Sequence, residues 1–404
     1  MIIRITYVIL TGLYSFTLAF LMSKVSHLSN ISIAGLTLVT TCYLLLTNPA
    51  PADTTSQSLA SILDSIRLKY NLPALAGAIF TTDGVVEIAA VGVRKTGTTI
   101  PVTTDDLWHL GSDTKMMTAA LAGTFVAQKR LSWEDKVISF FPEIADRVPV
   151  ATRNITLAQV LAHQAGLVAN LDWRALSQTG SLTQQRLLAT EMALMAPAYP
   201  PGTYHYANTD YVVVGAILEK IGGKPWEDLI SERIFRPLGM SSVGFGGTGT
   251  LGQIDQPWPH LPTGLPVSEN GPAVDNPEIM GPAGTVHCTM KDWAKFLIDQ
   301  LRGGVEMKAL LPISIYQAMQ MPVHNLGYGY GWSVTGRPWA GGKALWHNGS
   351  NTLNYTVCWL APAKKFGVLV CTNQGGSSAE KACSSDAADA MILRYLAKIK
   401  AESP

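Results

Sequence analysis

The sequence has little charge, and the charge that it has is balanced. Charged residues make up 15% of the 404 positions, and 30 Lys and Arg against 29 Asp and Glu give a formal net charge of +1. There is no block of basic residues and no stretch where aromatic and basic residues interleave, and such patterns mark nucleic-acid-binding surfaces. The composition therefore argues against a nucleic-acid partner and favours a small-molecule or peptide substrate.

Cysteine is also scarce, with five residues in the chain. None forms a C-x-x-C pair or alternates with histidine at the spacing of a zinc site, so we predict no metal and no other cofactor. Cys358 and Cys371 lie on two β-type runs that flank the turn at residues 361–365, where they could face each other across a hairpin. A disulfide would need an oxidising compartment, and free buried thiols are the more common outcome.

The longest apolar runs lie at the N-terminus, at residues 2–22 and 31–47. One interpretation is a pair of membrane-spanning helices, although the second run is shorter than the roughly 20 residues that a span needs. The other is a secretory leader that starts at Met22, with Lys24 as its basic region and Ala50-Pro51-Ala52 as the cleavage site.

We favour export. Residues 1–52 are predicted to be a signal peptide or membrane-anchor leader, and residues 53–404 the folded domain. That domain is expected in the periplasm or another extracytoplasmic space, with any membrane association made through the N-terminal segment.

Apolar periodicity predicts strands near both ends of this domain and helices between them. Strands are expected at residues 76–81, 85–93, 328–334, 343–346, 353–360 and 366–372. Helices are expected at residues 58–70, 112–127, 157–163, 211–221, 226–234, 290–301 and 379–399. The fold class is thus α/β (α+β): an antiparallel sheet built from both chain ends and flanked by helices, with a mostly helical lobe inserted at roughly residues 113–300.

A Gly- and Pro-rich stretch at residues 244–284 interrupts this pattern. It lacks apolar periodicity, and its prolines exclude a helix or a central strand over most of its length. Loops this long are functional or disordered. Trp258 favours a packed loop beside a pocket, and a simple insertion is the alternative.

The most informative motif is Ser112-Asp113-Thr114-Lys115, at the start of a long apolar helix. Residues three apart on a helix share one face, so the amine of Lys115 can reach the Ser112 hydroxyl. Residues 116–127 carry no charge, which predicts burial on nearly all sides. Burial lowers the pKa of a lysine and makes Lys115 a candidate base for a nucleophilic Ser112. The motif alone leaves open a surface serine and lysine at a helix end.

Two other polar segments stand at the ends of predicted elements. Tyr206 and Asn208 precede a helix expected from near Asp210 and can point to one side of a loop, although alone they could be a packed aromatic and a helix N-cap. His347 and Gly349 follow a short β-type run. Alternation places them on one face of an edge strand, where the glycine leaves backbone accessible to a ligand. A hairpin turn with an exposed histidine is the alternative.

Together, Ser-x-x-Lys, Tyr-x-Asn and His-x-Gly in this order resemble the serine β-lactamase and penicillin-binding-protein superfamily. The resemblance is strongest to the class C-like branch, which contains esterases, D-amino-acid peptidases and β-lactamase-related serine hydrolases. Residues 161–167, which are similar to the family's His-x-Ser-Gly-Leu segment, and residues 282–286 add to it. The resemblance covers essentially residues 58–396 and implies a β-lactamase/transpeptidase-like fold.

The resemblance also implies roles for individual residues. Ser112 would be acylated, and Lys115 and Tyr206 would take its proton and deliver one to the leaving group. Four further residues are implied in substrate binding: Asn208, His347, Gly349 and Ser350. Asn208 would also bind Lys115, and the backbone N–H groups of Ser112 and Ser350 would bind the oxyanion.

One departure from the family pattern concerns the substrate. Many β-lactamases and D,D-peptidases carry Lys-Thr-Gly where this chain has His347-Asn348-Gly349, and that lysine is a permanent cation suited to a substrate carboxylate. Histidine, with an ordinary pKa of about 6.5, is mostly neutral at pH 7. We therefore predict a serine hydrolase that cleaves ester or amide bonds through an acyl-enzyme and handles anionic β-lactams poorly. The alternatives are a D,D-carboxypeptidase or D-aminopeptidase acting on cell-wall peptides, and a penicillin-binding sensor that is acylated without turnover.

Overall fold

The computed structural model of the protein describes residues 57–178, 180–323 and 327–402. The predicted leader at residues 1–52, with its Cys42, lies outside the described residues, so the leader and the exported location stay predictions. Across the described ranges, no helix combines the length and the apolar character that a membrane crossing requires.

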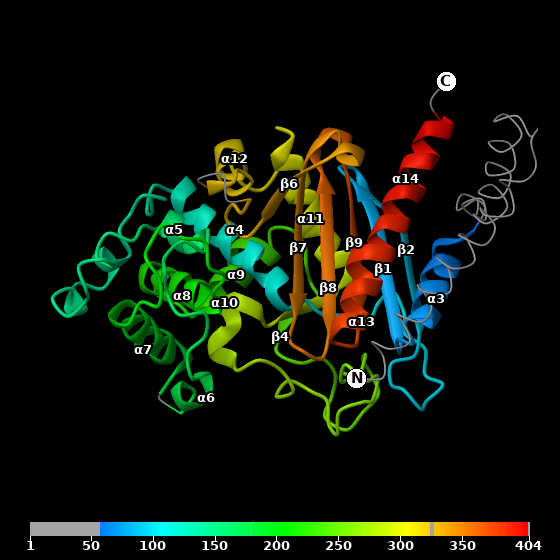
Figure 1. The fold of residues 1–404 in the computed structure, drawn as a ribbon, viewed down its shortest axis with the longest axis horizontal. Helices are drawn as coiled ribbons and strands as arrows, with labels where there is room; N and C mark the ends of the chain where they lie inside the picture. The colour runs from blue at the N-terminus through cyan, green and yellow to red at the C-terminus, as the bar shows by residue number, and fades with distance from the viewer. Residues whose placement is uncertain (1–56, 179, 324–326, 403–404) are drawn as a thin grey trace, which may run out of the picture. The chain divides into compact units, whose positions relative to one another are not determined.

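A six-stranded antiparallel sheet, in the order β2-β1-β9-β8-β7-β6, organises the domain (Figure 1). Its strands are β1 (Ala74–Thr81), β2 (Gly84–Gly92), β6 (Ser333–Arg337), β7 (Gly342–Ser350), β8 (Tyr355–Ala361) and β9 (Phe366–Thr372). The N-terminal hairpin pairs with the C-terminal strands through β1 and β9. The predicted sheet from both chain ends is confirmed.

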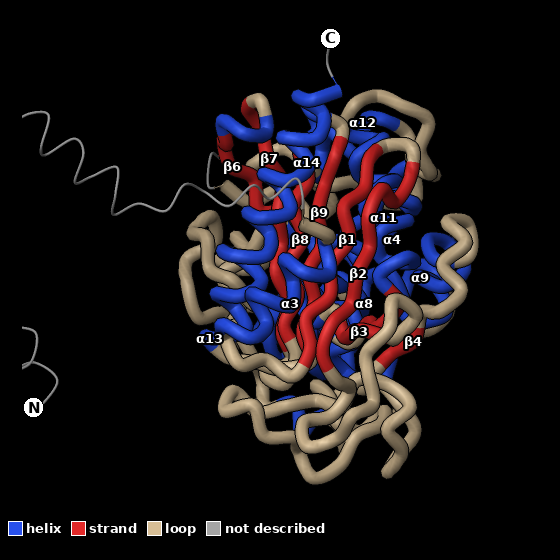
Figure 2. Tube along the Cα trace, turned by 90° about the vertical axis from the view of Figure 1, so that its right-hand side faces the viewer, coloured by secondary structure: helices blue, strands red, loops and turns tan. Residues whose placement is uncertain are grey.

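Helices cover both faces of this sheet, as the side view in Figure 2 shows. Alternate residues of β1 explain why: Ala76, Ala78 and Phe80 pack into the core shared with the helical lobe, whereas Leu75 and Ile79 pack into the opposite core. The opposite face is covered by α3 (Leu59–Lys69), α13 (Ser377–Glu380), a π-helical turn (Lys381–Ala387) and α14 (Ala388–Glu402). The single C-terminal helix expected from the sequence is thus a run of three helical segments.

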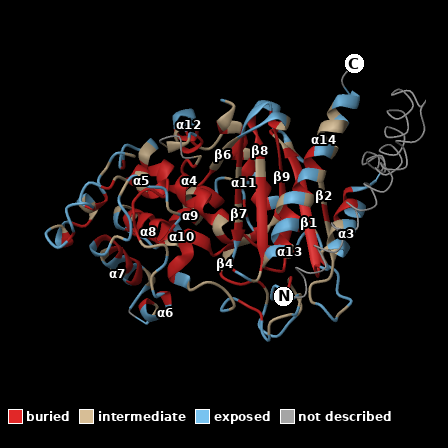
Figure 3. Cartoon of the chain, viewed as in Figure 1, coloured by how far each residue is buried: buried red, intermediate tan, exposed pale blue. Residues whose placement is uncertain are grey.

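The other face of the sheet meets α11 (Met290–Gly304) and the helical lobe. The lobe helices are α4 (Thr114–Ala127), α5 (Leu157–Leu161), α6 (Trp173–Leu176), α7 (Leu182–Met195), α8 (Asn208–Gly222), α9 (Trp226–Ile230), the π-helical Ser231–Phe235, α10 (Gly281–Gly284) and α12 (Ile313–Met319). Short 3-10 turns occur at η1 (Gly111–Asp113), η2 (Val137–Phe140), η3 (Pro142–Ile144), η5 (Glu278–Met280), η7 (Pro338–Ala340) and η8 (Pro362–Lys364). Helices α4 and α8 lie in the buried centre of the lobe (Figure 3).

A second, three-stranded sheet joins the lobe to the rest of the domain. Its order is β3-β5-β4, with β3 (Leu107–His109), β5 (Val286–Thr289) and β4 (Gly244–Phe245). The sequence did not predict this sheet, because its strands span only two to four residues. Periodicity cannot mark segments so short.

Between β4 and η5, residues 246–277 form a packed loop, as Trp258 favoured in the sequence, and the end of the predicted stretch forms η5 and α10. Trp258 is buried, and its Nε1 donates to the Val267 carbonyl at 2.8 Å. His260 is fully buried and accepts from the Thr96 N–H through Nε2 at 3.1 Å, while its Nδ1 lies 2.9 Å from the Asn373 carbonyl. These contacts tie the loop to the segments that follow β2 and β9.

One local prediction was wrong. Residues 328–334 do not form a strand: Tyr328 bridges back to Ser333 across a turn, and β6 begins only at Ser333. Cys358 and Cys371 are free, buried thiols, the more common of the two outcomes considered from the sequence. They face the same core, but the register pairs Cys358 with Leu369, which places Cys371 two residues further along the neighbouring strand.

Candidate active site

Ser112 lies in the 3-10 turn η1, directly before α4, where the end of β7 packs against it. Two glycines make this approach possible. Gly111 has φ +51°, and a Cβ there would collide with the backbone N of Ser350. A Cβ at Gly349 would come within 2.8 Å of the Ser112 N and closer still to the Leu110 carbonyl. Protein backbone thus fills the space beside Gly349, and the N–H groups of Ser112 and Ser350 belong to adjoining segments.

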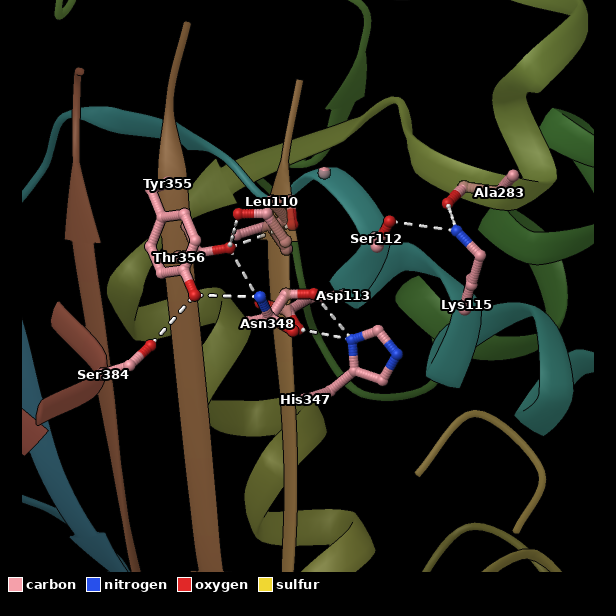
Figure 4. A network of polar contacts seen from close by, with 12 residues as sticks. Leu110, Ser112, Asp113, Lys115, Ala283, His347, Asn348, Tyr355, Thr356 and Ser384 are labelled. Carbon is pink, nitrogen blue, oxygen red and sulfur yellow. Dashed lines mark hydrogen bonds and ion pairs between the residues drawn. The ribbon is translucent and has the colours of Figure 1, made fainter. Parts of the chain in front are cut away.

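Lys115 is fully buried on α4, and Figure 4 shows its amine pointing toward the Ser112 hydroxyl. Its Nζ lies 3.0 Å from Oγ of Ser112, 2.8 Å from Oδ1 of Asn208 and 2.7 Å from the carbonyl oxygen of Ala283. Burial lowers the pKa of Lys115 to about 7, although Asp113 and Asp210 act in the opposite direction. All of residues 114–125 are buried, so the predicted sheltering of this helix is confirmed.

The three partners of the Lys115 amine differ in what they can accept or donate. The side-chain oxygen of Asn208 and the carbonyl of Ala283 can only accept. A neutral amine has two N–H groups and one lone pair, so its two donors go to these two oxygens. The lone pair then faces Ser112, whose hydroxyl can donate to it. This geometry suits removal of the Ser112 proton.

Tyr206 stands beside the same amine, with its ring centroid 4.9 Å from Nζ of Lys115. The residue as a whole is 36% exposed. Burial around the hydroxyl raises the pKa of Tyr206 well above its ordinary value, and an interaction with the Ser112 side chain only partly opposes this rise. Tyr206 therefore holds its proton at neutral pH.

Asn208 is the first residue of α8, and Ala207 occupies the N-cap position. The alternative role of Asn208 as an N-cap is therefore excluded. Its amide is held between two partners, because Oδ1 accepts from Lys115 and Nδ2 donates to Oδ1 of Asn170 at 2.9 Å. The structure thus brings together Ser112, Lys115, Tyr206 and Asn208, as the sequence predicts.

His347 also lies near the nucleophile, but its side chain is only 3% exposed. Its Nδ1 lies 2.8 Å from the Asn348 carbonyl and 3.2 Å from Oδ1 of Asp113, and both oxygens are acceptors, so this nitrogen carries a proton. Its Nε2 lies 3.0 Å from the Tyr328 hydroxyl. The exposed histidine that the sequence left open is excluded, and protein groups occupy both ring nitrogens.

The strand context of His347 differs from the predicted edge strand. Strand β7 lies between β8 and β6, but β6 pairs only with residues 342–346. The segment from His347 to Ser350 therefore extends past β6 and meets η1 there. Burial alternates as expected, with Leu345, His347 and Gly349 all buried on the face toward the lobe. The Ser350 hydroxyl donates to the Asn354 carbonyl at 2.7 Å, so only its backbone faces the nucleophile segment.

Asp113, inside the Ser-x-x-Lys motif, links the sheet to the nucleophile turn, as Figure 4 shows. It is fully buried, and its Oδ2 accepts from the Thr356 hydroxyl at 2.8 Å while Oδ1 contacts His347. We did not single out Asp113 or Thr356 from the sequence. The position of Asp113 beside Ser112 was the available signal.

The backbone of α10 is the other contribution that the sequence analysis missed. The Ala283 carbonyl accepts from Lys115, and the Pro282 carbonyl accepts from the Thr118 hydroxyl at 2.7 Å. Gly215 on α8 leaves the room for the Pro282 ring. A carbonyl group is present in every residue, so no side-chain type marks this role.

Comparison with known proteins places this geometry in a family. A family model described as beta-lactamase matches residues 54–390. The chain belongs to the beta-lactamase family. Penicillin-binding protein 4 of Amycolatopsis lactamdurans is 25% identical over 336 residues, which cover 77% of this chain and 84% of that protein. The chain spans about half the length of several other curated relatives.

Solved structures of beta-lactamase-family proteins have the same fold. The D-alanine carboxypeptidase AmpC from Burkholderia cenocepacia gives a TM-score of 0.66 at 20% identity, over 85% of this chain and 99% of that one. A class C beta-lactamase from Rhodobacter sphaeroides gives 0.67 at 17% identity, over 84% and 99%. The predicted membership in the serine β-lactamase and penicillin-binding-protein superfamily is confirmed, and the family relatives indicate serine hydrolase activity.

Proposed function

We propose that this beta-lactamase-family protein hydrolyses uncharged ester or amide bonds through an acyl-enzyme on Ser112. The observation that carries the proposal is the buried amine of Lys115, whose two obligate acceptors, Asn208 and Ala283, leave its lone pair for the Ser112 hydroxyl. A pKa of about 7 keeps a large share of this amine neutral at physiological pH. Lys115 is therefore the base in the proposed reaction.

Proton flow in the proposed reaction follows from the lowered pKa of Lys115 and the raised pKa of Tyr206. The Ser112 proton passes to Nζ of Lys115 as Oγ forms a bond to the substrate carbonyl carbon. The oxyanion is held by the N–H groups of Ser112 and Ser350, a kind of contribution worth about 10²–10³ in rate per donor in other enzymes. The bond to the leaving group then breaks, and Tyr206, still a phenol, gives the leaving oxygen or nitrogen its proton. The Lys115 ammonium returns a proton to Tyr206, and water repeats the sequence in deacylation.

The preference for uncharged substrates rests on His347. At this strand position many family members have a lysine, a permanent cation. Here the ring is buried and protein groups, Asp113, Asn348 and Tyr328, occupy both of its nitrogens, so neither nitrogen is open to a substrate carboxylate. Tyr206 adds a partly exposed aromatic residue beside the Lys115 amine, which suits an apolar acyl or alcohol group.

A substrate panel tests the proposal. The purified protein is assayed with a short-chain p-nitrophenyl ester, a D-alanyl-D-alanine peptide and a cephalosporin, with Ser112→Ala as the blank. We expect steady turnover of the ester with the highest kcat/KM. Faster hydrolysis of the cephalosporin would refute the substrate preference, and a stoichiometric burst without turnover would favour the sensor alternative.

A further inference from the structure

His163 is a buried titratable residue that the proposed reaction does not use. It is fully buried just after α5, and its φ of +58° lies in the left-handed region, where asparagine, aspartate and histidine are the most tolerated residues after glycine. A residue keeps such a backbone conformation only where its surroundings determine it. The contacts of His163 show what those surroundings are.

One histidine contacts the chain on both sides of Tyr206. Its carbonyl accepts from the His205 N–H at 2.8 Å, and its Nδ1 accepts from the Ala207 N–H at 3.3 Å. Its Nδ1 also lies 2.9 Å from Oδ2 of Asp210, on the first turn of α8. Its ring packs against the Tyr206 ring with 4.4 Å between centroids. His163 therefore holds the residue before Tyr206, the residue after it and the Tyr206 ring itself.

Two groups converge on Nδ1 of His163: the Ala207 N–H at 3.3 Å and Oδ2 of Asp210 at 2.9 Å. Burial raises the pKa of Asp210 and lowers the pKa of His163, so it disfavours the charged form of each group. The contact between Oδ2 of Asp210 and Nδ1 orients the histidine ring.

We propose that His163, oriented by Asp210, is a positioning residue that holds the Tyr206 phenol at the Ser112–Lys115 pair. This inference rests on the proposed function, in which Tyr206 protonates the leaving group. Within the described residues, Nε2 of His163 has no hydrogen-bond partner, so the orientation of the ring depends on Nδ1. A histidine needed only for packing could be replaced by another ring of similar size.

His163→Phe makes this distinction, because it keeps an aromatic ring and removes Nδ1. The assay compares kcat/KM for a p-nitrophenyl ester and an ethyl ester of the same acid. A p-nitrophenolate leaves without a proton, whereas an ethoxide needs one. We expect His163→Phe and Tyr206→Phe each to lower kcat/KM for the ethyl ester about 10²-fold and for the p-nitrophenyl ester by less than about tenfold, as loss of general acid catalysis predicts.

Two further variants test the assignment to Nδ1. His163→Asn keeps an acceptor near the position of Nδ1 and tolerates the positive φ, so it should recover at least about tenfold of the ethyl ester rate. His260→Phe is the matched control. It also removes a buried histidine with two hydrogen-bond partners, but this histidine lies in the Gly- and Pro-rich loop. It should leave the ratio of the two ester rates unchanged.

The double variant His163→Phe/Tyr206→Phe decides whether the histidine acts through the tyrosine. We expect it to be no more than about threefold slower than Tyr206→Phe, since both changes remove one function. Equal losses on the two esters, or losses that multiply in the double variant, would overturn the proposal. If His163→Phe does not fold, as judged by its thermal transition, the same cycle with His163→Leu, which also removes Nδ1, gives the answer. Failure of the wild-type protein to turn over either ester would instead refute the proposed function.

Discussion

The buried Lys115 amine predicts how the rate of ester hydrolysis changes with pH. In the proposed reaction only the neutral amine accepts the Ser112 proton. With a pKa of about 7, kcat/KM should fall tenfold for each pH unit below 7 and level off above about pH 8. At pH 5 the rate should be about a hundredth of the plateau. Tyr206 does not counteract this rise near neutrality, because burial raises its pKa.

The size of the shift in the pKa of Lys115 follows from the burial of its amine. Lowering the pKa from 10.5 to about 7 corresponds to a preference for the neutral form of roughly 5 kcal/mol, at about 1.36 kcal/mol per pKa unit. The same difference affects folding. Between pH 7 and 10.5 the unfolded chain binds this proton and the folded chain does not, so the free energy of unfolding contributed by Lys115 rises with pH in that window.

The assay measures kcat/KM from pH 5 to 9 with a short-chain p-nitrophenyl ester, after subtraction of the Ser112→Ala rate, which accounts for spontaneous hydrolysis. Asp113→Asn provides a check on the assignment. The Asp113 carboxylate raises the pKa of Lys115, so its removal should move the midpoint to lower pH. Lys115→Arg should be inactive at every pH, because a guanidinium stays protonated. A profile that is flat between pH 6 and 8, or that falls with rising pH, would show that Lys115 is not the base.

Two other predictions concern the packing that supports the site. Gly349→Ala places a methyl group against the Leu110 carbonyl and within 2.8 Å of the Ser112 N, so kcat/KM should drop by at least about 10²-fold. Gly336→Ala is the control, because its Cβ would meet nothing within 4 Å. Equal values of kcat/KM in the two variants would contradict the close approach of Gly349 to the nucleophile turn. Arg186→Leu leaves Glu219 buried without its partner and should lower the free energy of unfolding in urea by about 3–5 kcal/mol. Removing the exposed Arg147, paired with Glu191, should cost under about 1 kcal/mol, and similar costs for both arginines would argue against the buried pair.

The elements that the sequence predicted well are those whose buried side follows a simple period. Strand β9 was expected at residues 366–372 and has those bounds, and the N-terminal hairpin differs by two residues at most. Helix α7 was missed because its buried face is partly polar. It buries Arg186 against Glu219 and Glu227 and exposes Leu187 and Met192, so apolar periodicity does not identify its inner face.

In the candidate site, too, only contacts that follow from local periodicity could be predicted. Ser112 and Lys115 could be placed together from sequence because one helical turn separates them, and their contact depends on no other element. The environment of His347 could not be predicted, since it depends on β7 extending past β6 and on Tyr328 leaving the strand that periodicity suggested. The hydroxyl that reaches Nε2 therefore comes from a turn.

The division between lobe and sheet also separates the two demands of the proposed chemistry. Burial in the lobe lowers the pKa of Lys115, and the two oxygens that bind its protons, on Asn208 and Ala283, belong to the lobe. The backbone that approaches the Ser112 N–H belongs to β7 and is held through Asp113 and His347. Changes in the lobe should therefore shift the pH at which the enzyme works. Changes in β7 should lower turnover equally at every pH, because oxyanion binding does not depend on the protonation of Lys115.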